Sequence, residues 1–328
     1  PFGGSFRVID FTLANCASSG LGRVYILAQY LAESLRRCLS DSWPSAVRGR
    51  SIEILPPASH HRPYRGTADA VYQNLGLAEC HRPRDVLILA GDHIYRADYQ
   101  KLLQIHRDLR ADVTVLTGEV DTCKASSFGV LAISDDSRIT RFVEKPADTE
   151  PFARDGKCPI NLGVYCFRTE FLVEMLSRDA GEQTSHDFGK DLLPASVRTG
   201  RAFSCPLGLV SPDVRPYWRD VGTVDAFFEA NMDLLGNSPA FEISHPSWSA
   251  TPIIHERLPV RSSVTARIRG RGVRGFNVVS RGAMILSADV VNCVVSPGVL
   301  VGEGAQLQDC VLFPGARIGE GAVLRRAI

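Results

Sequence analysis

The sequence predicts an α/β domain followed by a parallel β-helix, and three observations support this prediction. Short apolar runs alternate with helical patterns over the first two thirds of the chain. Such alternation favours a mostly parallel, Rossmann-like sheet that helices cover on both sides. Glycines and apolar residues then recur at short, regular intervals near the end of the chain. At 328 residues the chain is longer than one hydrophobic core usually serves, so two domains are expected.

Three strands and two helices are expected in the first domain. Ligands gather at the carboxyl ends of strands in such sheets, and Gly91-Asp92 ends one of the expected strands. Both helices keep their apolar residues near one face. The strands are residues 22–28, 85–92 and 111–117, and the helices are residues 67–79 and 99–110.

The β-helix prediction depends on an internal repeat. VVSRGAMI begins at Val278, VVSPGVLV at Val294 and VLFPGARI at Val311, at offsets of 16 and 17 residues. A period of six is typical of a β-helix built from hexapeptides, and three hexads make one triangular coil, so about three coils are expected. Ordinary short hairpins are the alternative, but they do not explain why glycines recur in register. The apolar residues six apart are Val295, Val301, Leu307 and then Leu312, Ile318, Leu324.

These patterns suggest how the chain divides. Proline, serine and asparagine become frequent after about Leu235, as in a linker. We therefore expect the α/β domain at 1–235, a linker at 236–262 and the β-helix at 263–328. The chain starts at Pro1 rather than at a methionine and stops inside the repeat. Both ends are therefore expected to be cut from a longer protein.

Composition excludes several classes of function. The net charge is +1, from 37 basic and 36 acidic residues, so no overall field favours nucleic acid or a membrane surface. The sequence contains neither an apolar run long enough to span a membrane nor a signal-peptide pattern. Nine scattered cysteines suggest neither a disulfide framework nor a zinc site. We expect a cytoplasmic protein without a nucleic-acid or membrane partner, in which local charges bind any anionic ligand.

The segment YRGTADAV begins at Tyr64 and suggests a phosphate or nucleotide site. Thr67 follows Gly66 and is expected to open a helix, with Ala68 next along the chain. The backbone N–H groups at a helix start are free, and they lie at the positive end of the helix dipole. The alternative is that Thr67 is a simple N-cap.

Two acidic residues far apart in sequence are candidate metal ligands. Asp92 follows an apolar strand, and Asp220 lies in PYWRDVGT. Mg²⁺ takes one or two carboxylates together with substrate phosphates, so the two residues could converge on one ion. The alternatives are a turn residue for Asp92 and a helix cap for Asp220.

A lysine and a polar segment complete the candidates. Lys145 follows Glu144 in FVEKPAD, and it is one of only five lysines among the 37 basic residues. A compact ammonium suits a phosphate, whereas the alternative is a surface salt bridge to Glu144. Residues 185–191, SHDFGKD, are expected to be a polar loop that caps the next helix. Adjacent residues point apart, so His186 and Asp187 are not expected to form a catalytic pair.

Seven motifs together resemble the ADP-glucose pyrophosphorylase family, the glucose-1-phosphate adenylyltransferases of bacterial glycogen synthesis. The motifs cover nearly the whole chain, in the order and roughly the spacing of that family. The resemblance implies a nucleotidyltransferase sheet followed by a left-handed parallel β-helix. The motifs are PFGGSFRVIDFTLANCASSG, YRGTADAVYQN, LILAGDHIYRADY, SSFGV, FVEKPAD, SHDFGKDLLP and PYWRDVGT.

The resemblance also implies a reaction and its residues. A phosphate oxygen of glucose 1-phosphate attacks the α-phosphorus of ATP, which forms ADP-glucose for glycogen or starch and releases pyrophosphate. Alignment and charge neutralisation do most of the work, and no protein nucleophile is required. The family's metal aspartates map onto Asp92 and Asp220, which hold Mg²⁺, and Lys145 joins them as a catalytic residue. The sugar-phosphate contacts map onto Tyr64, Gly129, Glu144, Lys145 and Asn161, and the nucleotide contacts onto Gly66, Thr67 and Ala68.

The sequence departs from the family pattern at three places. Asn161 stands where the family usually has serine, and Ser5 stands where a lysine is common. The glycine-rich triphosphate loop with its arginine, and a lysine shortly before Pro1, are missing from these 328 residues. Residues 1–328 alone are therefore expected to show no detectable turnover.

Two other functions compete with the enzyme. One is a catalytically silent regulatory subunit or homologue, and the other is the same chemistry with a different nucleotide such as UTP or dTTP. The resemblance further implies a homotetramer and allosteric small-molecule effectors. Arg36, Arg37 and Arg274 are candidate effector contacts, with a solvated surface as the alternative for each.

Overall fold

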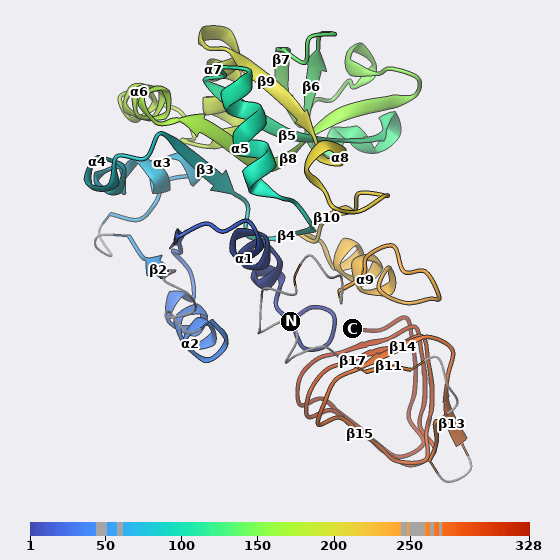
Figure 1. Cartoon of the computed structure of the whole chain (residues 1–328). Helices are drawn as coiled ribbons and strands as arrows, with labels where there is room; N and C mark the ends of the chain where they lie inside the picture. The colour runs from blue at the N-terminus through green and yellow to red at the C-terminus, as the bar shows by residue number, and fades with distance from the viewer. Residues whose placement is uncertain (44–50, 58–61, 244–247, 249–259, 263–265, 269–270) are drawn as a thin grey trace. The chain divides into compact units, whose positions relative to one another are not determined.

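The computed structural model divides the chain into two compact units, each discontinuous in sequence (Figure 1). Unit 1 comprises Pro1–Ser18, Gly91–Arg96 and Arg215–Ile328, and unit 2 comprises Ser19–Ala90 and Ala97–Val214. Most of the expected linker, 236–262, lies outside the described residues, and the expected domain boundaries remain a prediction. The structure describes residues 1–43, 51–57, 62–243, 248, 260–262, 266–268 and 271–328.

A six-stranded sheet forms the centre of unit 2. Its order is β7-β6-β8-β5-β9, and β3 also pairs with β8. A separate two-stranded parallel sheet joins β1 and β2. The strands are β1 (Arg23–Leu27), β2 (Ser51–Leu55), β3 (Asp85–Leu89), β5 (Val113–Asp121), β6 (Gly129–Ile133), β7 (Ile139–Glu144), β8 (Lys157–Arg168) and β9 (Ala202–Pro206).

Strand β8 determines the directions in this sheet. It pairs antiparallel with β3 and β5, so those two strands run in the same direction, and β9 pairs parallel with β5. The shared direction of β3, β5 and β9 is the one expected of a Rossmann-like sheet. Strand β8, which runs in the opposite direction, is not among the strands predicted from the sequence. Its apolar residues satisfy a buried position in either direction, so composition alone did not reveal its orientation.

The predicted strands and the helix at 99–110 are confirmed. Strands β1, β3 and β5 lie at the three apolar runs, and α5 spans Tyr99–Asp108. Asp98 caps α5, because its carboxylate accepts hydrogen bonds from the backbone N–H groups of Gln100 and Lys101. The apolar face therefore predicted this helix correctly, whereas the Asp98 cap is a finding of the structure.

The predicted helix at 67–79 is wrong as a single element. The chain forms α3 (Thr67–Tyr72) and α4 (Gly76–His81) instead. The Asn74 side chain donates a 2.8 Å hydrogen bond to the Ala70 carbonyl, the acceptor that the Asn74 backbone would use in a continuous helix. The Asn74 backbone N–H turns to the Val71 carbonyl, at 3.0 Å. This competition between side chain and backbone breaks the helix.

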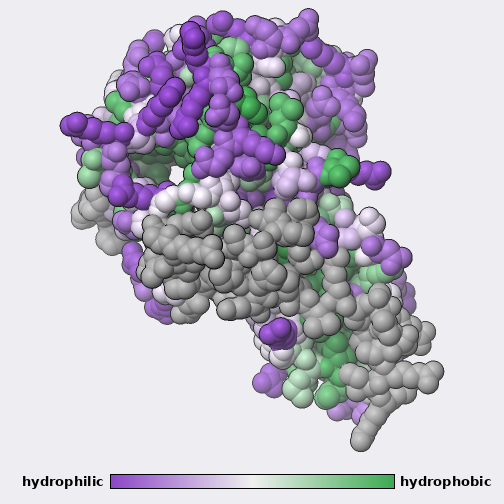
Figure 2. Space-filling model, viewed as in Figure 1, coloured by the Kyte–Doolittle hydropathy of each residue, from purple (hydrophilic) through white to green (hydrophobic). Residues whose placement is uncertain are grey.

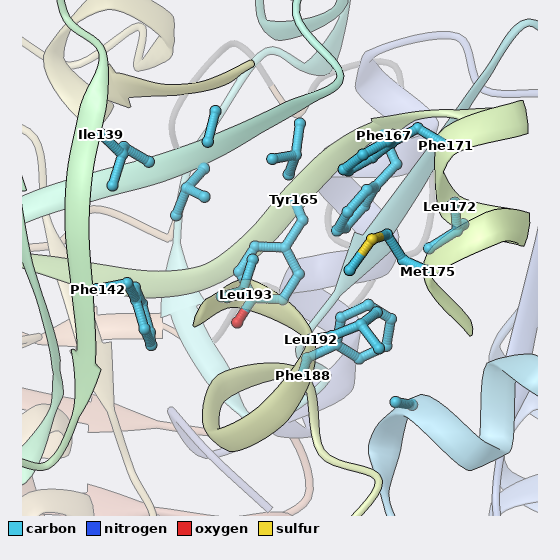
Figure 3. Close-up of a cluster of buried hydrophobic side chains, with 14 of the residues drawn as sticks. Ile139, Phe142, Tyr165, Phe167, Phe171, Leu172, Met175, Phe188, Leu192 and Leu193 are labelled. Atoms are coloured by element: carbon cyan, nitrogen blue, oxygen red, sulfur yellow. The ribbon is translucent and has the colours of Figure 1, made fainter. Parts of the chain in front are cut away.

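Aromatic and aliphatic side chains from β8, α6 and η3 form the core of unit 2 (Figure 3). Tyr165 stacks on Phe188, with ring centroids 5.7 Å apart, and Phe167 also contacts Phe188. The core thus anchors η3 directly to the sheet. The remaining helices of the unit are α2 (Ala32–Ser42), η1 (Thr122–Ser127), η2 (Glu150–Phe152), α6 (Thr169–Ala180), η3 (Phe188–Leu192), α7 (Leu193–Thr199) and α8 (Leu207–Val210).

Unit 1 contains a small α/β portion with its own aromatic core. Strands β4 (His93–Tyr95) and β10 (Trp218–Asp220) pair antiparallel. Helix α1 (Val8–Ser18) packs against β4, and α9 (Val224–Met232) follows β10. Phe11 of α1 packs against Phe2, Phe241 and Trp248.

The β-helix occupies the rest of unit 1, and its coils stack around a triangular cross-section (Figure 1). This confirms the predicted left-handed parallel β-helix. Its three sheets have the orders β11-β14-β17-β20, β12-β13-β16-β19-β22 and β15-β18-β21. The strands are β11 (Val260–Ser262), β12 (Ala266–Ile268), β13 (Arg271–Arg274), β14 (Asn277–Val279), β15 (Met284–Ile285), β16 (Asp289–Val291), β17 (Val294–Val295), β18 (Leu300–Val301), β19 (Gln306–Gln308), β20 (Val311–Leu312), β21 (Arg317–Ile318) and β22 (Val323–Arg325).

Left-handed backbone at the corners explains why glycines recur in register. Gly282, Gly298 and Gly315 occupy equivalent corners with φ between 70° and 82°. Asn292 and Asp309 occupy another corner with φ of 53° and 51°. There the Asn292 amide donates a 3.3 Å hydrogen bond to the Asp309 carboxylate, which connects successive coils.

The surface of the described residues is mainly hydrophilic on the face seen in Figure 2. None of the described helices combines the length and the apolar character that a membrane span needs. The cysteines whose side chains are described are all free thiols.

Shortening a buried side chain of the β-helix should destabilise it strongly. Leu307 on β19 is 2% exposed, so L307A should lower the free energy of unfolding by about 2–5 kcal/mol through lost burial and a cavity. The neighbouring Q306A removes an exposed side chain and should stay within about 0.5 kcal/mol of wild type. Chemical denaturation of both variants measures the difference, and equal midpoints would contradict the assigned faces of the coil.

Candidate functional site

The two candidate metal ligands lie on or beside the paired strands β4 and β10 of unit 1. Strand pairing places Asp220 directly opposite His93, the residue that follows Asp92. The Asp92 side chain is 72% exposed, and its carboxylate lies 3.5 Å from Nε2 of His93. The structure therefore brings together two acidic residues that are 128 positions apart in sequence.

The residues around Asp220 anchor it to α9. The Tyr217 hydroxyl donates a 2.9 Å hydrogen bond to Oδ2 of Asp233, and Nε of Arg219 donates to the same oxygen at 3.1 Å. Oδ1 of Asp220 accepts a 2.8 Å hydrogen bond from the Gly222 backbone N–H, which orients the carboxylate. The alternative that Asp220 caps a helix is wrong. Thr223 caps α9, since the Thr223 hydroxyl accepts from the Ala226 N–H.

The carboxylate pair has the chemistry that magnesium requires. Carboxylate oxygens are preferred ligands of Mg²⁺, which keeps several waters or phosphate oxygens besides one or two protein carboxylates. Within the described part of the chain, no group of three or more His, Cys, Asp or Glu residues could hold a metal ion. Asp92 and Asp220 therefore fit a metal that shares its coordination with a phosphate ligand rather than one enclosed by protein.

The remaining candidates lie in unit 2, where the segment from Gly66 to Ala68 packs against the loop before η3. Helix α3 starts at Thr67, as predicted, with Gly66 as its N-cap. A Cβ atom on Gly66 would lie 2.3 Å from the His186 carbonyl oxygen, so only glycine allows this approach.

Two expectations for this segment need correction. The backbone N–H groups of Ala68 and Asp69 are not free, because both donate to the His186 carbonyl at 2.8 and 3.3 Å. Thr67 does not cap its own helix: its hydroxyl donates to Oδ2 of Asp187 at 2.9 Å and accepts from the Phe188 N–H at 3.0 Å. The loop before η3 therefore fixes the conformation of this segment. The Ala68 and Asp69 N–H groups at the start of α3 are not available to a ligand.

Asp69 fixes the other side of the same segment. Its carboxylate accepts hydrogen bonds from the Arg65 backbone N–H, the Arg65 guanidinium and the Gln73 amide, at 2.9, 3.0 and 2.7 Å. Burial opposes ionisation, but these donors hold the pKa of Asp69 below its ordinary value. The pairing keeps the Arg65 backbone in place beside Gly66.

Glu144 is half-buried between two glycines. A Cβ atom on Gly129 would lie 2.6 Å from Oε2 of Glu144, and one on Gly189 would lie 2.7 Å from it. Burial raises the pKa of Glu144, and Asp187 adds to this, while Lys145 and Lys190 act in the opposite direction. Because glycine has no side chain, both residues leave space for the Glu144 carboxylate. This carboxylate is partly shielded from solvent.

Lys145 extends from the same strand end into solvent. Its backbone is in the left-handed region, with φ of 46°, and its N–H donates to the Phe128 carbonyl at 3.0 Å. A non-glycine residue in this region is unusual and often marks a functional position. The side chain is exposed and forms no salt bridge with Glu144, in contrast to the alternative considered from the sequence.

Asn161 and Tyr64 make internal contacts. The Asn161 amide donates to the Tyr165 hydroxyl at 2.9 Å, and its oxygen accepts from the Gly163 N–H at 2.9 Å. Asn161 thereby stabilises the left-handed Gly163, which lies where β8 changes its partner from β6 to β3. The Tyr64 hydroxyl donates to the Leu55 carbonyl and accepts from the Asn74 amide, both at 3.1 Å.

Other residues named from the sequence lie elsewhere. The Ser5 hydroxyl bonds to Ser280 of the β-helix at 2.9 Å. Arg36 and Arg37 are exposed on α2 and form ion pairs with Glu33. Arg274 belongs to β13, but its side chain lies outside the described residues.

The loop at 185–189 makes contacts that the sequence pattern does not predict. The predicted cap is confirmed, since the Asp187 carboxylate accepts from the N–H groups of Gly189 and Lys190, but residues 188–191, expected as loop, belong to η3. The contacts not predicted are those of Asp187 with the Thr67 hydroxyl and of Gly189 with Glu144. The signal was a contiguous polar motif that contains a glycine, but its partners are more than 40 residues away in sequence.

Comparison with known families agrees with these arrangements. A sequence model of the nucleotidyl transferase family matches residues 1–237. A model of a GlmU-like C-terminal hexapeptide domain matches residues 263–328. The chain therefore belongs to the nucleotidyl transferases.

Curated relatives place the chain more narrowly. It is 40% identical to glucose-1-phosphate adenylyltransferase 2 of Alkalilimnicola ehrlichii, over 94% of this chain and 74% of the relative. Identity to the glucose-1-phosphate adenylyltransferase of Koribacter versatilis is 41%, over 93% and 75% of the two chains. For glucose-1-phosphate adenylyltransferase 2 of Vibrio cholerae it is 38%, over 93% and 77%. Within the nucleotidyl transferases, the chain belongs to the glucose-1-phosphate adenylyltransferase family.

The buried position of Glu144 should reduce stability at neutral pH. A carboxyl group with a raised pKa binds its proton more tightly in the folded state, so stability is lost as pH rises through its titration. E144Q should therefore have a higher Tm than wild type at pH 7 and a smaller advantage near pH 4. Thermal melts at both pH values measure this. The exposed control E119Q should show no comparable pH-dependent gain, and an E144Q variant less stable than wild type at pH 7 would contradict the proposed origin of the shift.

Proposed function

We propose that the protein transfers the adenylyl group of ATP to α-D-glucose 1-phosphate, which forms ADP-glucose and pyrophosphate. The single observation that carries the proposal is the 36–41% identity to curated glucose-1-phosphate adenylyltransferases over about 94% of the chain. The retained acid pair and the exposed lysine support it, because a catalytically silent subunit needs neither. The product supplies glucosyl units for glycogen or starch.

The reaction joins two anions, so local positive charge is its main requirement. A phosphate oxygen of glucose 1-phosphate forms a bond to the α-phosphorus of ATP, and the bond from that phosphorus to the β-phosphate bridging oxygen breaks. The electron pair of that bond leaves with pyrophosphate. With a net charge of +1, the protein must neutralise these anions locally.

Lys145 and Glu144 bind the sugar phosphate in this proposal. The Lys145 ammonium contacts the phosphate, and its left-handed backbone fixes the direction in which the side chain leaves the strand. The Glu144 carboxylate accepts hydrogen bonds from sugar hydroxyls. These compensate for the water contacts that Glu144 loses through its partial burial. Gly129, Asn161 and Tyr64 line the sugar subsite, where Asn161 substitutes an amide for a hydroxyl.

Gly66, Thr67 and Ala68 contact the nucleotide. The N–H groups of Ala68 and Asp69 are already bonded, so this contact uses the shape and carbonyl groups of the segment rather than a free helix terminus. Gly66 allows the loop carbonyl of His186 to approach the segment closely, which fixes the backbone that contacts the nucleotide.

Asp92 and Asp220 hold Mg²⁺, which supplies charge neutralisation at the phosphates when it is bound. The contribution of the chain is the strand pairing that places Asp220 opposite His93, the residue after Asp92, and the Gly222 hydrogen bond that orients Asp220.

The wider context is also a proposal. Exposed apolar side chains on the β-helix, at Met284, Leu286, Phe313 and Val323, favour contacts between subunits, and we expect a homotetramer. Regulation by small-molecule effectors follows from the family resemblance. The free thiols of the described cysteines suit the cytoplasm, where ATP and glucose 1-phosphate are available.

A product assay tests this function directly. The full-length protein with ATP, glucose 1-phosphate and Mg²⁺ should produce equimolar ADP-glucose and pyrophosphate, which ³¹P NMR resolves. UTP and dTTP in place of ATP should give at least ten-fold lower rates. Absence of product with all three nucleotides would favour the silent subunit, and a faster reaction with UTP or dTTP would overturn the choice of ATP.

Loss of either metal carboxylate should abolish most of the activity. D92N and D220N each remove a negative charge with little change in shape, so kcat should fall by about 10²–10⁴ while folding is retained. The control D225N changes an exposed carboxylate on α9 of the same unit and should keep the wild-type rate. Steady-state kinetics over a range of Mg²⁺ concentrations measures the effect, and a wild-type rate for D92N would remove Asp92 from the mechanism.

Neutralising Lys145 should weaken binding of the sugar phosphate selectively. Loss of a charged contact of about 1.5–3 kcal/mol predicts that K145Q raises the KM for glucose 1-phosphate by about 10- to 100-fold. The KM for ATP should change less than three-fold. K124Q alters an exposed lysine on η1 and serves as the control. A larger effect on ATP than on glucose 1-phosphate would assign Lys145 to the nucleotide instead.

A further inference from the structure

His186 holds an unusual backbone conformation in the loop before η3. Its φ is 54°, in the left-handed region, and its side chain is 5% exposed. A bulky residue in this region is strained, and such strain persists only where the surroundings enforce it.

The ring of His186 supplies this enforcement. Nδ1 lies 2.8 Å from Oδ2 of Asp179 and 3.1 Å from Oγ1 of Thr184. The Thr184 hydroxyl in turn donates to Oδ1 of Asp179 at 2.8 Å. Asp179 is buried near the end of α6, so the imidazole is tied to a packed helix of the core.

The carbonyl of His186 connects the loop to the start of α3. It accepts hydrogen bonds from Ala68 and Asp69, and it lies so close to Gly66 that a methyl group there would overlap it. A carbonyl in this position therefore sets the path of the backbone from Gly66 to Asp69. A rotation of the His186 peptide would release both hydrogen bonds at once.

The residues after His186 extend the connection. Asp187 receives the Thr67 hydroxyl, and Gly189 abuts the Glu144 carboxylate. One short loop therefore touches the segment assigned to the nucleotide and the carboxylate assigned to the sugar. The ring of His186 acts on the nucleotide segment through its own carbonyl, whereas the contact to Glu144 comes from Gly189.

We propose that His186, held by Asp179, is a positioning residue that sets the geometry of the nucleotide-binding segment Gly66–Ala68. The inference rests on the proposed function, since it assumes that this segment contacts ATP. It predicts that disturbing His186 weakens ATP binding more than glucose 1-phosphate binding, although His186 itself touches neither substrate.

Two variants remove the support in different ways. H186G keeps the left-handed backbone accessible and deletes the ring, and D179N keeps the ring but replaces its carboxylate partner. Each should raise the Kd for ATP about 5- to 20-fold by calorimetry, and the KM for ATP similarly. The KM for glucose 1-phosphate should change less than two-fold. H186N should recover part of the loss, because asparagine tolerates the left-handed region and carries an amide.

His106 provides a matched control. It is 2% exposed in unit 2, with Nδ1 2.8 Å from the Thr114 hydroxyl and Nε2 3.6 Å from Asp85. H106Q therefore disturbs a buried histidine with the same kinds of partner, away from the loop. It should lower thermal stability without changing the balance between the two substrates.

The outcomes separate the inference from the proposed function. An ATP-selective loss in H186G or D179N, partly recovered in H186N and absent in H106Q, supports the positioning role. Unchanged ATP binding in a folded H186G or D179N would overturn it, as would equal losses for both substrates. A wild-type protein that binds ATP but makes no ADP-glucose would overturn the proposed function, while the calorimetry would still test His186.

Discussion

The hydrogen bonds from Ala68 and Asp69 to the His186 carbonyl are the contact on which the geometry of the candidate nucleotide segment depends. They join the start of α3 to the loop that begins η3, and the core anchors that loop through Phe188 (Figure 3). The close approach requires glycine at position 66. Because the same loop reaches Glu144, the backbone of one candidate subsite and the carboxylate of another share a single support.

Burial and local charge explain how a nearly neutral protein can handle two anionic substrates. Glu144 is held partly desolvated between glycines, and Lys145 leaves the strand end in a strained conformation. Strand pairing places Asp220 opposite the neighbour of Asp92. None of these features requires a large net charge on the protein. Each costs stability or conformational freedom, as functional sites often do.

Much of the fold and part of the site could be predicted from the sequence, for identifiable reasons. The β-helix was predictable because glycine recurs at one set of left-handed corners, and apolar residues recur between them, at a fixed period. The meeting of Asp92 with Asp220 was predictable only as a hypothesis, since the β4–β10 pairing that produces it joins distant segments. The break after α3 depends on one Asn74 side chain, and the bonded state of the Ala68 amide depends on a loop more than 100 residues away. Periodicity carries no information about such contacts.

Direct attack of glucose 1-phosphate on ATP, without a protein nucleophile, has a decisive stereochemical test. The full-length protein is given one diastereomer of ATP with sulfur on the α-phosphorus, and the configuration of the resulting thio-ADP-glucose is determined. A single in-line displacement aligned by these residues predicts inversion at the α-phosphorus. Retention would reveal two successive displacements through a covalent intermediate on the protein, and would contradict catalysis by alignment and charge neutralisation alone.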